Sequence, residues 1–495
     1  MTMSSPRSLS GVMTVPRSLF KIVVSAGGLL LLLILISFQL TCYPLISSFH
    51  VSLLPVEQNR KSDSAVLSGT GNIDTQSVNI SVSLNANEVI QHTDTPSSAI
   101  YNDSVKSDLG NSDGVTLDIN RSSFHIEDST YLDSGNCDLY NGKWIYDLDG
   151  PLYTNNTCPV ISPKQNCQGN GRSDKEYENW RWKPKNCHLP RFDAKKFLEL
   201  MRGKTLAFVG DSIARNQMES LLCILWQVTA SSSFEAPKKR RKGKRQYFYF
   251  KSTSTTLTRY WSSWLVHQTT ESFASVPDNI VKVHLDLPDE DFMENLPKFD
   301  VVVLSSGHWF VKQSAYILNG TLVGGQLWQP KGEGNMQIKN IDAFGISVET
   351  CLTAIASHPN FTGLAIVRSY SPDHYEGGAW NTGGSCTGKD RPLTTVVRNG
   401  FTDVMHEKQV NSFVNAVKKA RVDSKLRLMD ITEPFAYRPD GHPGPYRSPD
   451  PNKNTKRGAN GEPPPQDCLH WCMPGPIDTW NEILLEVIRR EFHGR

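Results

Sequence analysis

The feature that most limits what this chain can fold into is a long apolar segment near its N-terminus. Residues 22–40 (IVVSAGGLLLLLILISFQL) carry no charge, and about 20 such residues are needed to cross the hydrocarbon core of a bilayer. Arg7, Arg17 and Lys21 precede the segment without any acidic residue, and positive charge beside a span favours the cytoplasmic side. We therefore expect a cytoplasmic tail (1–21), a transmembrane signal-anchor (22–41) and a lumenal remainder.

A cleaved signal peptide is the alternative interpretation of this segment. Signal peptides usually have an apolar core of about 7–15 residues followed by small residues at the cleavage site. Here the run is longer, and Thr41-Cys42-Tyr43 follows it. The pattern favours an uncleaved anchor and a single-pass type II membrane protein.

Sequons and cysteines agree with a lumenal location. Nine of the ten cysteines follow Ser134 and lack the repeated C-x-x-C spacing of a zinc site. In an oxidising compartment they predict four disulfides with one thiol left over, and their pairing stays open. The disulfide candidates are Cys137, Cys158, Cys167, Cys187, Cys223, Cys351, Cys386, Cys468 and Cys472. The candidate glycosylation sites are Asn79, Asn102, Asn120, Asn155, Asn319 and Asn360.

The charge balance does not support a nucleic-acid partner, because 52 basic residues stand against 50 acidic ones and phosphate binding usually requires a basic excess. One basic run, residues 238–245 (KKRRKGKR), resembles a nuclear localisation signal. Import receptors could not bind it in a lumen, so we expect a solvated loop. Contact with an anionic donor, an acidic polysaccharide or a membrane surface is the alternative.

Composition and periodicity divide the lumenal part into three. Residues 42–133 are rich in Ser, Asp, Asn and Thr without sustained periodicity, which predicts a disordered stem. Residues 134–191 contain four cysteines and predict a disulfide-rich, loop-rich subdomain. Residues 192–495 contain short apolar runs at 205–209, 301–304, 364–367 and 426–431, separated by segments long enough for helices. Such runs are typical of strands buried on both faces of a parallel sheet, so we expect an α/β three-layer sandwich.

Ser212 is the first candidate catalytic residue. It follows the apolar run at 205–209 through Gly210 and Asp211 and opens a segment with helical periodicity. The carboxyl end of a parallel strand faces the ligand crevice, and a helix N-terminus stabilises negative charge. A plain helix cap formed by Asp211 or Ser212 is the alternative.

Asp467 and His470 are the second element. In a turn, this spacing lets the carboxylate reach the Nδ1–H of the imidazole, which leaves Nε2 free to take a proton from a serine hydroxyl. A helix is expected to follow over residues 478–492. Together with a serine at a strand end, the pair predicts a Ser-His-Asp triad.

These blocks resemble a known family. Residues 208–217 (FVGDSIARNQ), 467–476 (DCLHWCMPGP), 368–386 (RSYSPDHYEGGAWNTGGSC) and the triplet Gly307-His308-Trp309 are similar to segments of the plant trichome-birefringence-like proteins. Residues 137–190 resemble the cysteine-rich N-terminal subdomain of that family, and residues 441–446 (GHPGPY) and 463–467 (PPPQD) resemble its altered-xyloglucan branch. The resemblance covers the chain from about residue 135 to its end.

The resemblance implies a GDSL/SGNH-hydrolase-like fold and a Golgi O-acetyltransferase that acts on a hemicellulose. Ser212 would be the acylated nucleophile, His470 the general acid/base and Asp467 the residue that orients it. Many relatives have an asparagine shortly before the Gly-His-Trp triplet, but here Ser305 and Ser306 stand there. The candidates for contacting the oxyanion or substrate are Arg215, Asn216, Ser305, Ser306, His308 and Trp309. For Arg215 and Asn216, ordinary helix-surface or capping roles are the alternative.

The expected reaction is double displacement through an acetyl-serine, with acetyl-CoA as a candidate donor by analogy and no metal. Xyloglucan is the first acceptor expected, with mannan or xylan as alternatives. A polysaccharide acetylesterase and a non-catalytic wall-polymer-binding protein are the alternatives from other classes. Protein partners and oligomeric state are not predicted.

Other aromatic and histidine residues have two interpretations each. Trp261, Trp264, Trp309 and Trp380 are candidates for stacking on sugar rings or for core packing. His308, His374 and His442 lie in polar, Gly/Pro-rich surroundings and are candidates for lining a cleft, without the spacing of metal ligands.

Overall fold

The protein is described here by a computed structural model. It describes residues 137–229, 237–242, 245–273, 276–330, 336–396, 399–450 and 466–493. The expected anchor, the stem and the sequons at Asn79, Asn102 and Asn120 lie outside these ranges, as does Cys42. Within them, no helix has the length and apolar character required to span a membrane. The predicted domain boundaries stay predictions.

A seven-stranded sheet forms the centre of the fold, in the order β13-β12-β9-β3-β6-β5-β4. Five neighbouring strands are parallel: β13 (Lys425–Met429), β12 (Leu364–Arg368), β9 (Val301–Ser305), β3 (Thr205–Gly210) and β6 (Thr255–Trp261). These include all four runs expected to be buried strands. The expected parallel sheet is present in these five strands, and the sheet as a whole is mixed, because β5 (Arg245–Phe250) and β4 (Lys238–Lys242) add an antiparallel hairpin beside β6.

The same hairpin corrects the expectation for the basic run. Residues 238–242 form strand β4 and Arg245 begins β5, so these residues are not a loop. The backbone hydrogen bonds of an antiparallel pair do not depend on side-chain polarity, so charged residues can form an edge strand.

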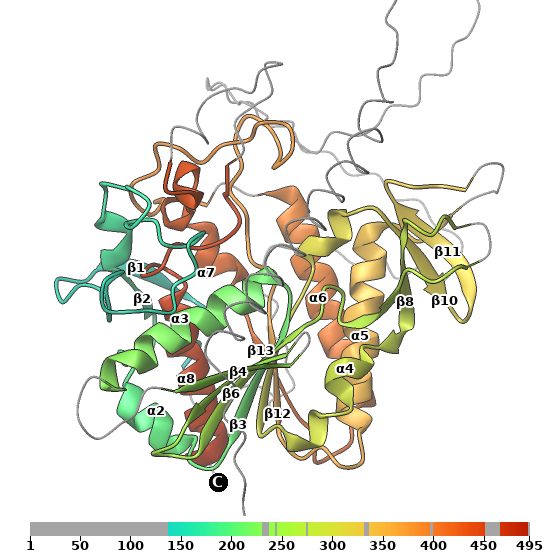
Figure 1. Cartoon of the computed structure of the whole chain (residues 1–495), viewed down its shortest axis with the longest axis horizontal. Coiled ribbons are helices and arrows are strands. Elements are labelled where there is room, and N and C mark those ends of the chain that lie inside the picture. The colour runs from blue at the N-terminus through green and yellow to red at the C-terminus, as the bar shows by residue number, and fades with distance from the viewer. Residues whose placement is uncertain are drawn as a thin grey trace, which may run out of the picture. The chain divides into compact units, whose positions relative to one another are not determined.

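Helices cover both faces of the central sheet (Figure 1). In β3, Leu206 and Phe208 pack into the core under α2 (Ala194–Leu200), α3 (Ser212–Thr229) and α8 (Asp478–His493). The alternate residues Ala207 and Val209 pack into the core under α5 (Asn340–Ser357) and α6 (Gly400–Lys419). Because successive side chains of a strand point to opposite faces, this alternation produces the layered α/β arrangement.

A second, four-stranded mixed sheet was not predicted. Its order is β11-β10-β8-β7, built from β7 (Val266–Thr269), β8 (Val281–Pro288), β10 (Ser314–Leu318) and β11 (Thr321–Gln326). The remaining short helices are α4 (Glu290–Met293), η2 (Leu296–Lys298), η3 (His308–Val311), α7 (Thr432–Ala436), η4 (Pro439–Gly441) and η5 (Pro445–Arg447). Asn319, in the turn between β10 and β11, and Asn360 are exposed, so both sequons are accessible to modification.

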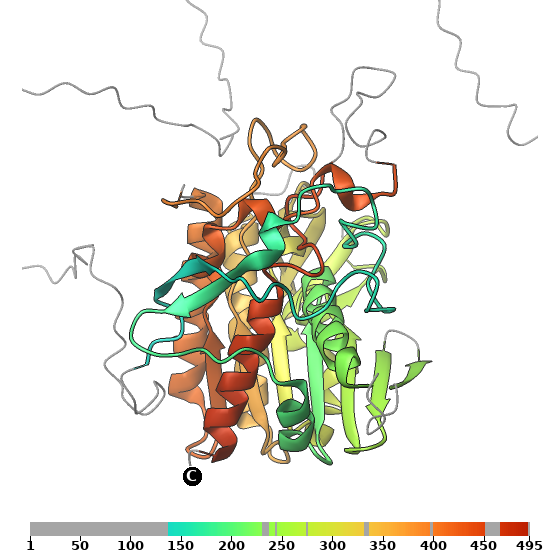
Figure 2. The same cartoon turned by 90° about the vertical axis from the view of Figure 1, so that its left-hand side faces the viewer.

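The N-terminal part consists of a two-stranded sheet, β1 (Gly142–Tyr146) and β2 (Trp180–Pro184), with η1 (Glu176–Asn179) and long loops. It lies across the face that carries α3 and α8 (Figure 2). The Cys158–Cys223 disulfide joins it to α3, while the hydroxyl of Tyr153 donates to the carboxylate of Asp478 at the start of α8.

The described residues contain four disulfides, as predicted, and Cys351 is a buried free thiol among them. The bonds are Cys137–Cys187, Cys158–Cys223, Cys167–Cys472 and Cys386–Cys468. Only the first joins two cysteines of the N-terminal part. The others connect segments that are distant in the sequence, which is why spacing could not predict the pairing.

Removal of the Cys167–Cys472 disulfide should destabilise the fold strongly. The bond closes a separation of 305 residues, and cross-links over long loops restrict the unfolded chain most, so a double alanine variant should lose about 3–5 kcal/mol of unfolding free energy. Urea unfolding followed by tryptophan fluorescence measures this loss. The control is Cys351→Ala, which removes only a buried thiol and should cost about 1–2 kcal/mol. A double-variant loss no larger than that of the control would contradict the prediction.

Candidate active site

The carboxyl ends of three parallel strands meet at one edge of the central sheet. Gly210 at the end of β3 pairs with Ser305 at the end of β9, and β12 ends at Arg368 beside β9. The φ angle of Gly210 is +151°, and a Cβ atom there would lie 2.1 Å from the carbonyl oxygen of Ser305. Only glycine permits this approach, which places the following residues, Asp211 and Ser212, directly beside the end of β9.

Asp211 caps helix α3, and Ser212 is its first residue. The Asp211 carboxylate accepts a hydrogen bond from the backbone N–H of Ile213 at 2.9 Å. Burial tends to raise the pKa of Asp211, but His308, the Ile213 amide and the charge of Arg368 outweigh it and lower that pKa. Because Asp211 caps the helix, the side chain of Ser212 is not required as a cap. The Ser212 side chain is partly buried and lies at the positive end of the helix dipole.

Asp467 and His470 form the contact that their spacing predicts. The carboxylate oxygens of Asp467 lie 2.9 and 3.0 Å from Nδ1 of His470, and the backbone N–H of His470 donates to the same carboxylate at 3.0 Å. Burial alone would raise the pKa of Asp467, but the charge and hydrogen bonds of His470, together with Arg447 at 3.5 Å, hold that pKa well below its usual range. The ionised carboxylate fixes the tautomer with hydrogen on Nδ1.

The remaining ring nitrogen of His470 is available for proton transfer. Nε2 is buried and has no hydrogen-bond partner among the residues that the structure describes. A buried imidazole nitrogen without a partner is costly in a purely structural role. It is the atom that the triad hypothesis assigns to the serine hydroxyl.

Asn216 connects helix α3 to the His470 turn. Its side chain accepts a hydrogen bond from the backbone N–H of Trp471 at 2.8 Å and donates to the carbonyl of the same residue at 3.2 Å. Ser212 lies four residues earlier, on the same face of α3. The hydroxyl-bearing end of the helix is therefore held beside the segment that carries His470. The catalytic roles of Ser212, His470 and Asp467 stay predictions.

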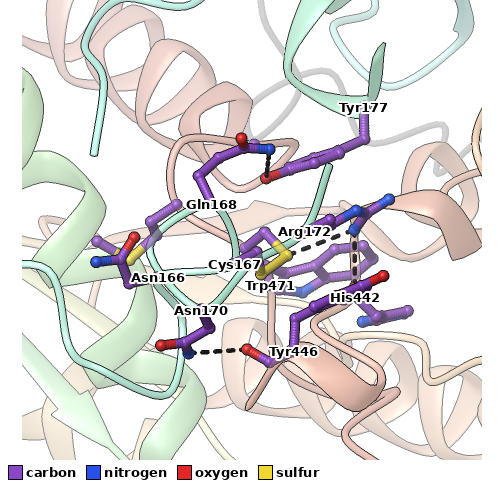
Figure 3. Close-up of a disulfide and its surroundings, with 12 residues drawn as sticks. Asn166, Cys167, Gln168, Asn170, Arg172, Tyr177, His442, Tyr446 and Trp471 are labelled. Carbon is purple, nitrogen blue, oxygen red and sulfur yellow. Dashed lines mark hydrogen bonds between the residues drawn. A yellow bond between two sulfur atoms is a disulfide. The ribbon is translucent and has the colours of Figure 1, made fainter. Parts of the chain in front are cut away.

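Two disulfides flank the His470 turn. Cys468 is bonded to Cys386 and Cys472 to Cys167, so both sides of the turn are covalently fixed to other segments. Arg172 lies against the second bond (Figure 3): its guanidinium stacks 3.8 Å from the Tyr177 ring centre and donates to the carbonyl of His442 at 3.1 Å. The turn therefore has little freedom to move independently of the fold.

The Gly-His-Trp triplet joins the three strand ends. Gly307 has a φ angle of +129°, and a Cβ atom there would lie 2.7 Å from the Tyr370 ring. His308 stacks on Tyr370 with 4.4 Å between ring centres, and its Nε2 lies 2.9 Å from the carbonyl oxygen of Ser371. Its Nδ1 lies 3.8 Å from the Asp211 carboxylate. His308 therefore supports Asp211, one residue before the candidate nucleophile.

The residues predicted to contact the oxyanion differ in whether their hydrogen-bond donors are already used. Asn216 already uses its amide on Trp471, and Arg215 lies 3.9 Å from the carboxylate of Glu219 along the same helix. Ser306 donates its hydroxyl to the carbonyl of Ser263 at 3.1 Å. The hydroxyl of Ser305 is buried and has no hydrogen-bond partner within the described part of the chain. The Nε atom of Arg215 is likewise buried without a hydrogen-bond partner in this part of the chain. Ser305, next to Gly210, and Arg215 are therefore the candidates with an unused donor.

The four candidate tryptophans have different environments. Trp264 is buried in the core, where it contacts Phe310. Trp261, the last residue of β6, and Trp309, in η3 after the end of β9, are partly exposed and form an edge-to-face pair with 5.9 Å between ring centres. Trp380 is 48% exposed, with the ammonium group of Lys312 positioned 3.7 Å from its ring centre.

Some residues of the site carried no signal in the sequence. Arg447 and the bridging role of Asn216 were not predicted. His374 and His442 contact each other, and His374 also lines a small cavity with Asp373 and Asn399, which agrees with the cleft-lining role predicted for it. Across the ranges that the structure describes, no cluster of three or more His, Cys, Asp or Glu side chains is suited to hold a metal ion.

Comparison with known proteins gives two family matches. Residues 189–487 match PC-Esterase, the GDSL/SGNH-like acyl-esterase family found in Pmr5 and Cas1p, and residues 135–188 match the PMR5 N-terminal domain. Protein YLS7 of Arabidopsis thaliana is 53% identical over 522 residues, covering 100% of this chain and 99% of that protein.

Two further relatives from the same plant match most of the chain. Protein trichome birefringence-like 18 is 66% identical over 359 residues, which is 72% of this chain and 66% of the relative. Xyloglucan O-acetyltransferase 1 is 38% identical over 366 residues, which is 74% of this chain and 82% of the relative.

Proposed function

Because this chain belongs to the trichome-birefringence-like branch of the PC-Esterase family, we propose that it is a polysaccharide O-acetyltransferase. This membership confirms the family resemblance that the sequence motifs indicated. A relative named for xyloglucan O-acetylation is 38% identical over most of its length. Xyloglucan is accordingly the first acceptor proposed, and mannan or xylan is the second.

The observation that carries this proposal is the Asp467–His470 pair held beside the start of α3. The pair supplies an oriented imidazole with an available Nε2, and Asn216 connects its turn to the helix that begins with Ser212. A nucleophile, a base and a group that orients the base are the parts required for acyl transfer through a covalent intermediate.

In the first half-reaction, the Oγ atom of Ser212 attacks the carbonyl carbon of the acetyl donor while Nε2 of His470 takes the hydroxyl proton. The Asp467 carboxylate stabilises the imidazolium that forms. We assign the N-terminal amide of α3 and the unused hydroxyl of Ser305 to stabilising the oxyanion. His470 then returns the proton to the leaving group, and an acetyl ester remains on Ser212. Acetyl-CoA is the donor proposed by analogy.

In the second half-reaction, a sugar hydroxyl replaces the departed group. Nε2 of His470 takes its proton, the sugar oxygen attacks the acetyl ester, and the proton returns to Oγ of Ser212. The products are an acetylated sugar and the free enzyme. Water in place of the sugar would make the same site an acetylesterase, so the two activities differ in how well the acceptor excludes water.

The partly exposed pair Trp261 and Trp309 offers an apolar surface at the sheet edge where β3 ends, because Trp261 pairs with Gly210. Sugar rings present C–H faces that pack on aromatic rings. Trp309→Ala is therefore expected to raise KM for the oligosaccharide about tenfold, which corresponds to about 1.4 kcal/mol. Turnover of a small acetyl ester should change less than twofold.

Steady-state kinetics with both substrates measure this difference. The matched control is Trp180→Ala, which removes a partly buried tryptophan of β2 in the N-terminal part. Equal effects of Trp309→Ala on the oligosaccharide and on the small ester would contradict acceptor binding at this surface.

We also propose that the protein is a single-pass type II membrane protein of the Golgi with its catalytic domain in the lumen. The uncharged run 22–40, the basic residues before it and four disulfides support this location. A protease-protection assay on Golgi vesicles tests it, since lumenal residues should be digested only after detergent is added.

The activity is tested with the full chain produced in a secretory host and purified in detergent. It would be incubated with acetyl-CoA or a chromogenic acetyl ester, and separately with xyloglucan, mannan and xylan oligosaccharides. Mass spectrometry would follow acetyl gain on each acceptor and acetyl-Ser212 in the peptide digest. Acetyl gain on one acceptor, with acetyl-Ser212 trapped in its absence, is the expected result.

Other outcomes distinguish the remaining functions. Donor breakdown without acetyl gain on any acceptor would indicate an esterase. Folded protein that neither forms acetyl-Ser212 nor consumes a donor would overturn the enzymatic proposal in favour of a wall-polymer-binding protein.

A further inference from the structure

Two histidines form a chain of three close polar contacts that ends at the backbone of His470. Nε2 of His374 lies 3.0 Å from the carbonyl oxygen of Ala436, and Nδ1 of the same ring lies 2.7 Å from Nε2 of His442. Nδ1 of His442 lies 2.7 Å from the carbonyl oxygen of His470. All three distances are within hydrogen-bonding range.

The number of protons that these three hydrogen bonds require can be counted from the two carbonyl oxygens at their ends. A carbonyl oxygen only accepts hydrogen bonds, so Nε2 of His374 and Nδ1 of His442 must both carry hydrogen. A neutral imidazole carries one hydrogen. With both rings neutral, the two facing nitrogens would therefore present lone pairs to each other at 2.7 Å. For all three hydrogen bonds to form, the two rings together require a third proton, located between them.

We propose that His374 and His442 share one additional proton and thereby act as positioning residues that hold the carbonyl of His470. This proposal rests on the proposed function in that it assigns His470 as the catalytic base. Neither ring touches the reacting atoms, so their effect on the reaction passes through the backbone of the His470 turn.

Burial limits how many protons the pair can hold. It lowers the pKa of His374 to about 4 and that of His442 well below its usual value, since both rings are removed from water. Two additional protons would place two charges next to each other and are excluded. One shared proton is opposed by burial but favoured by both carbonyl contacts, and it removes the lone-pair repulsion between the rings. The hydrogen-bond distances therefore favour the singly protonated pair.

The charged groups around the pair include both signs. The Asp440 carboxylate, paired with Arg438 at 2.8 Å, and the Asp467 carboxylate favour the proton. Glu376 favours it too, while Lys389, 2.9 Å from Glu376, and His470 oppose it. Arg172 donates to the carbonyl of His442, and Trp471 stacks on the His442 ring with 4.1 Å between ring centres. These contacts leave His442 little freedom to rotate away from His470.

Two substitutions at position 442 test the positioning role. The Nδ2 group of asparagine can occupy the place of the imidazole Nδ1 and donate to the His470 carbonyl, whereas leucine cannot donate. His442→Leu is expected to lower kcat for the chromogenic acetyl ester about 10- to 100-fold, as a displaced catalytic group does, with KM changed less than twofold. His442→Asn is expected to recover kcat to within about fivefold of the wild type.

The shared proton is tested separately with the full chain labelled with ¹⁵N in its histidines, at about pH 6. Wild type should show three protonated nitrogens and one unprotonated nitrogen for the pair, with signals assigned by their loss in His374→Gln and His442→Asn. The matched control is His406→Gln, which alters a partly buried histidine that is paired with Asp430 at 2.9 Å and contacts neither ring of the pair. It should leave these signals and kcat unchanged.

The outcomes separate this proposal from the proposed function. Wild-type kcat in folded His442→Leu, or equal losses in the leucine and asparagine variants, would overturn the positioning role. Two protonated nitrogens in the pair would overturn the shared proton. If His442→Leu does not fold, His374→Gln replaces it in the kinetic test and should lower kcat, since it removes the partner of His442. Inactivity of the wild type would instead contradict the proposed function, while the proton count would still be measured.

Discussion

Ser212→Ala is expected to lower kcat for acetyl transfer by about 10⁵- to 10⁶-fold, as removal of the nucleophile does in serine hydrolases. The hydroxyl is the atom that accepts the acetyl group, and Gly210 and α3 place it beside the end of β9. No acetyl-enzyme should form. Quenched-flow detection of acetylated peptide and the release of a chromogenic leaving group measure both losses.

The control for this substitution is Ser357→Ala. Its hydroxyl donates to the carbonyl of Thr353 near the end of α5, so the variant should keep wild-type kcat. A Ser212→Ala protein that retained activity within tenfold of the wild type and the same unfolding midpoint would show that Ser212 is not the nucleophile.

Asp467→Asn is expected to lower kcat by about 10⁴-fold while leaving the fold intact, as the equivalent change does in a serine protease. The Asn amide would donate to Nδ1 of His470, which places the imidazole hydrogen on Nε2. That nitrogen could then no longer accept the Ser212 proton. The loss should fall on the acetylation step, which pre-steady-state release of a chromogenic leaving group measures directly.

A matched control exists in the same domain. Asp430 contacts Nε2 of His406 at 2.9 and 3.0 Å, which reproduces the carboxylate–imidazole pair away from Ser212. Asp430→Asn should keep kcat within about threefold because it changes no reacting group. Equal losses in the two variants would indicate that stability, rather than the His470 tautomer, determines the effect.

Four strands of the central sheet, β3, β9, β12 and β13, were predictable because each contains a short apolar run. The neighbouring strand β6 was not, because its sequence, TTLTRYW, is largely polar. The strand 205–209, the helix after Ser212 and the C-terminal helix follow from local patterns and agree with β3, α3 and α8. The second sheet was missed because the strand predictions rested on continuous apolar runs. Strand β8, with the sequence VKVHLDLP, instead shows the alternation of apolar and polar residues that is typical of a strand with one buried face. The β4–β5 hairpin was missed because its pairing uses the backbone and the sequence of β4, KKRRK, is entirely basic.

The same distinction between local and distant contacts applies to the site. Asp467 and His470 are three residues apart, so spacing alone could predict their contact. The partners of Asn216 lie 255 residues away, and His374 and His442 are 68 residues apart. Such contacts arise from the fold as a whole, and one sequence contains no local pattern for them.

The disulfides on both sides of His470 determine when, after translation, the protein can become active. Cys386–Cys468 and Cys167–Cys472 tie the base-bearing turn to two segments translated earlier, so the turn can be secured only after the last part of the chain has been made and its thiols oxidised. A freshly translated, reduced polypeptide should therefore be catalytically silent. Thiol oxidation would serve as the maturation step, and acetylation would begin only where the cell supplies an electron acceptor for protein thiols.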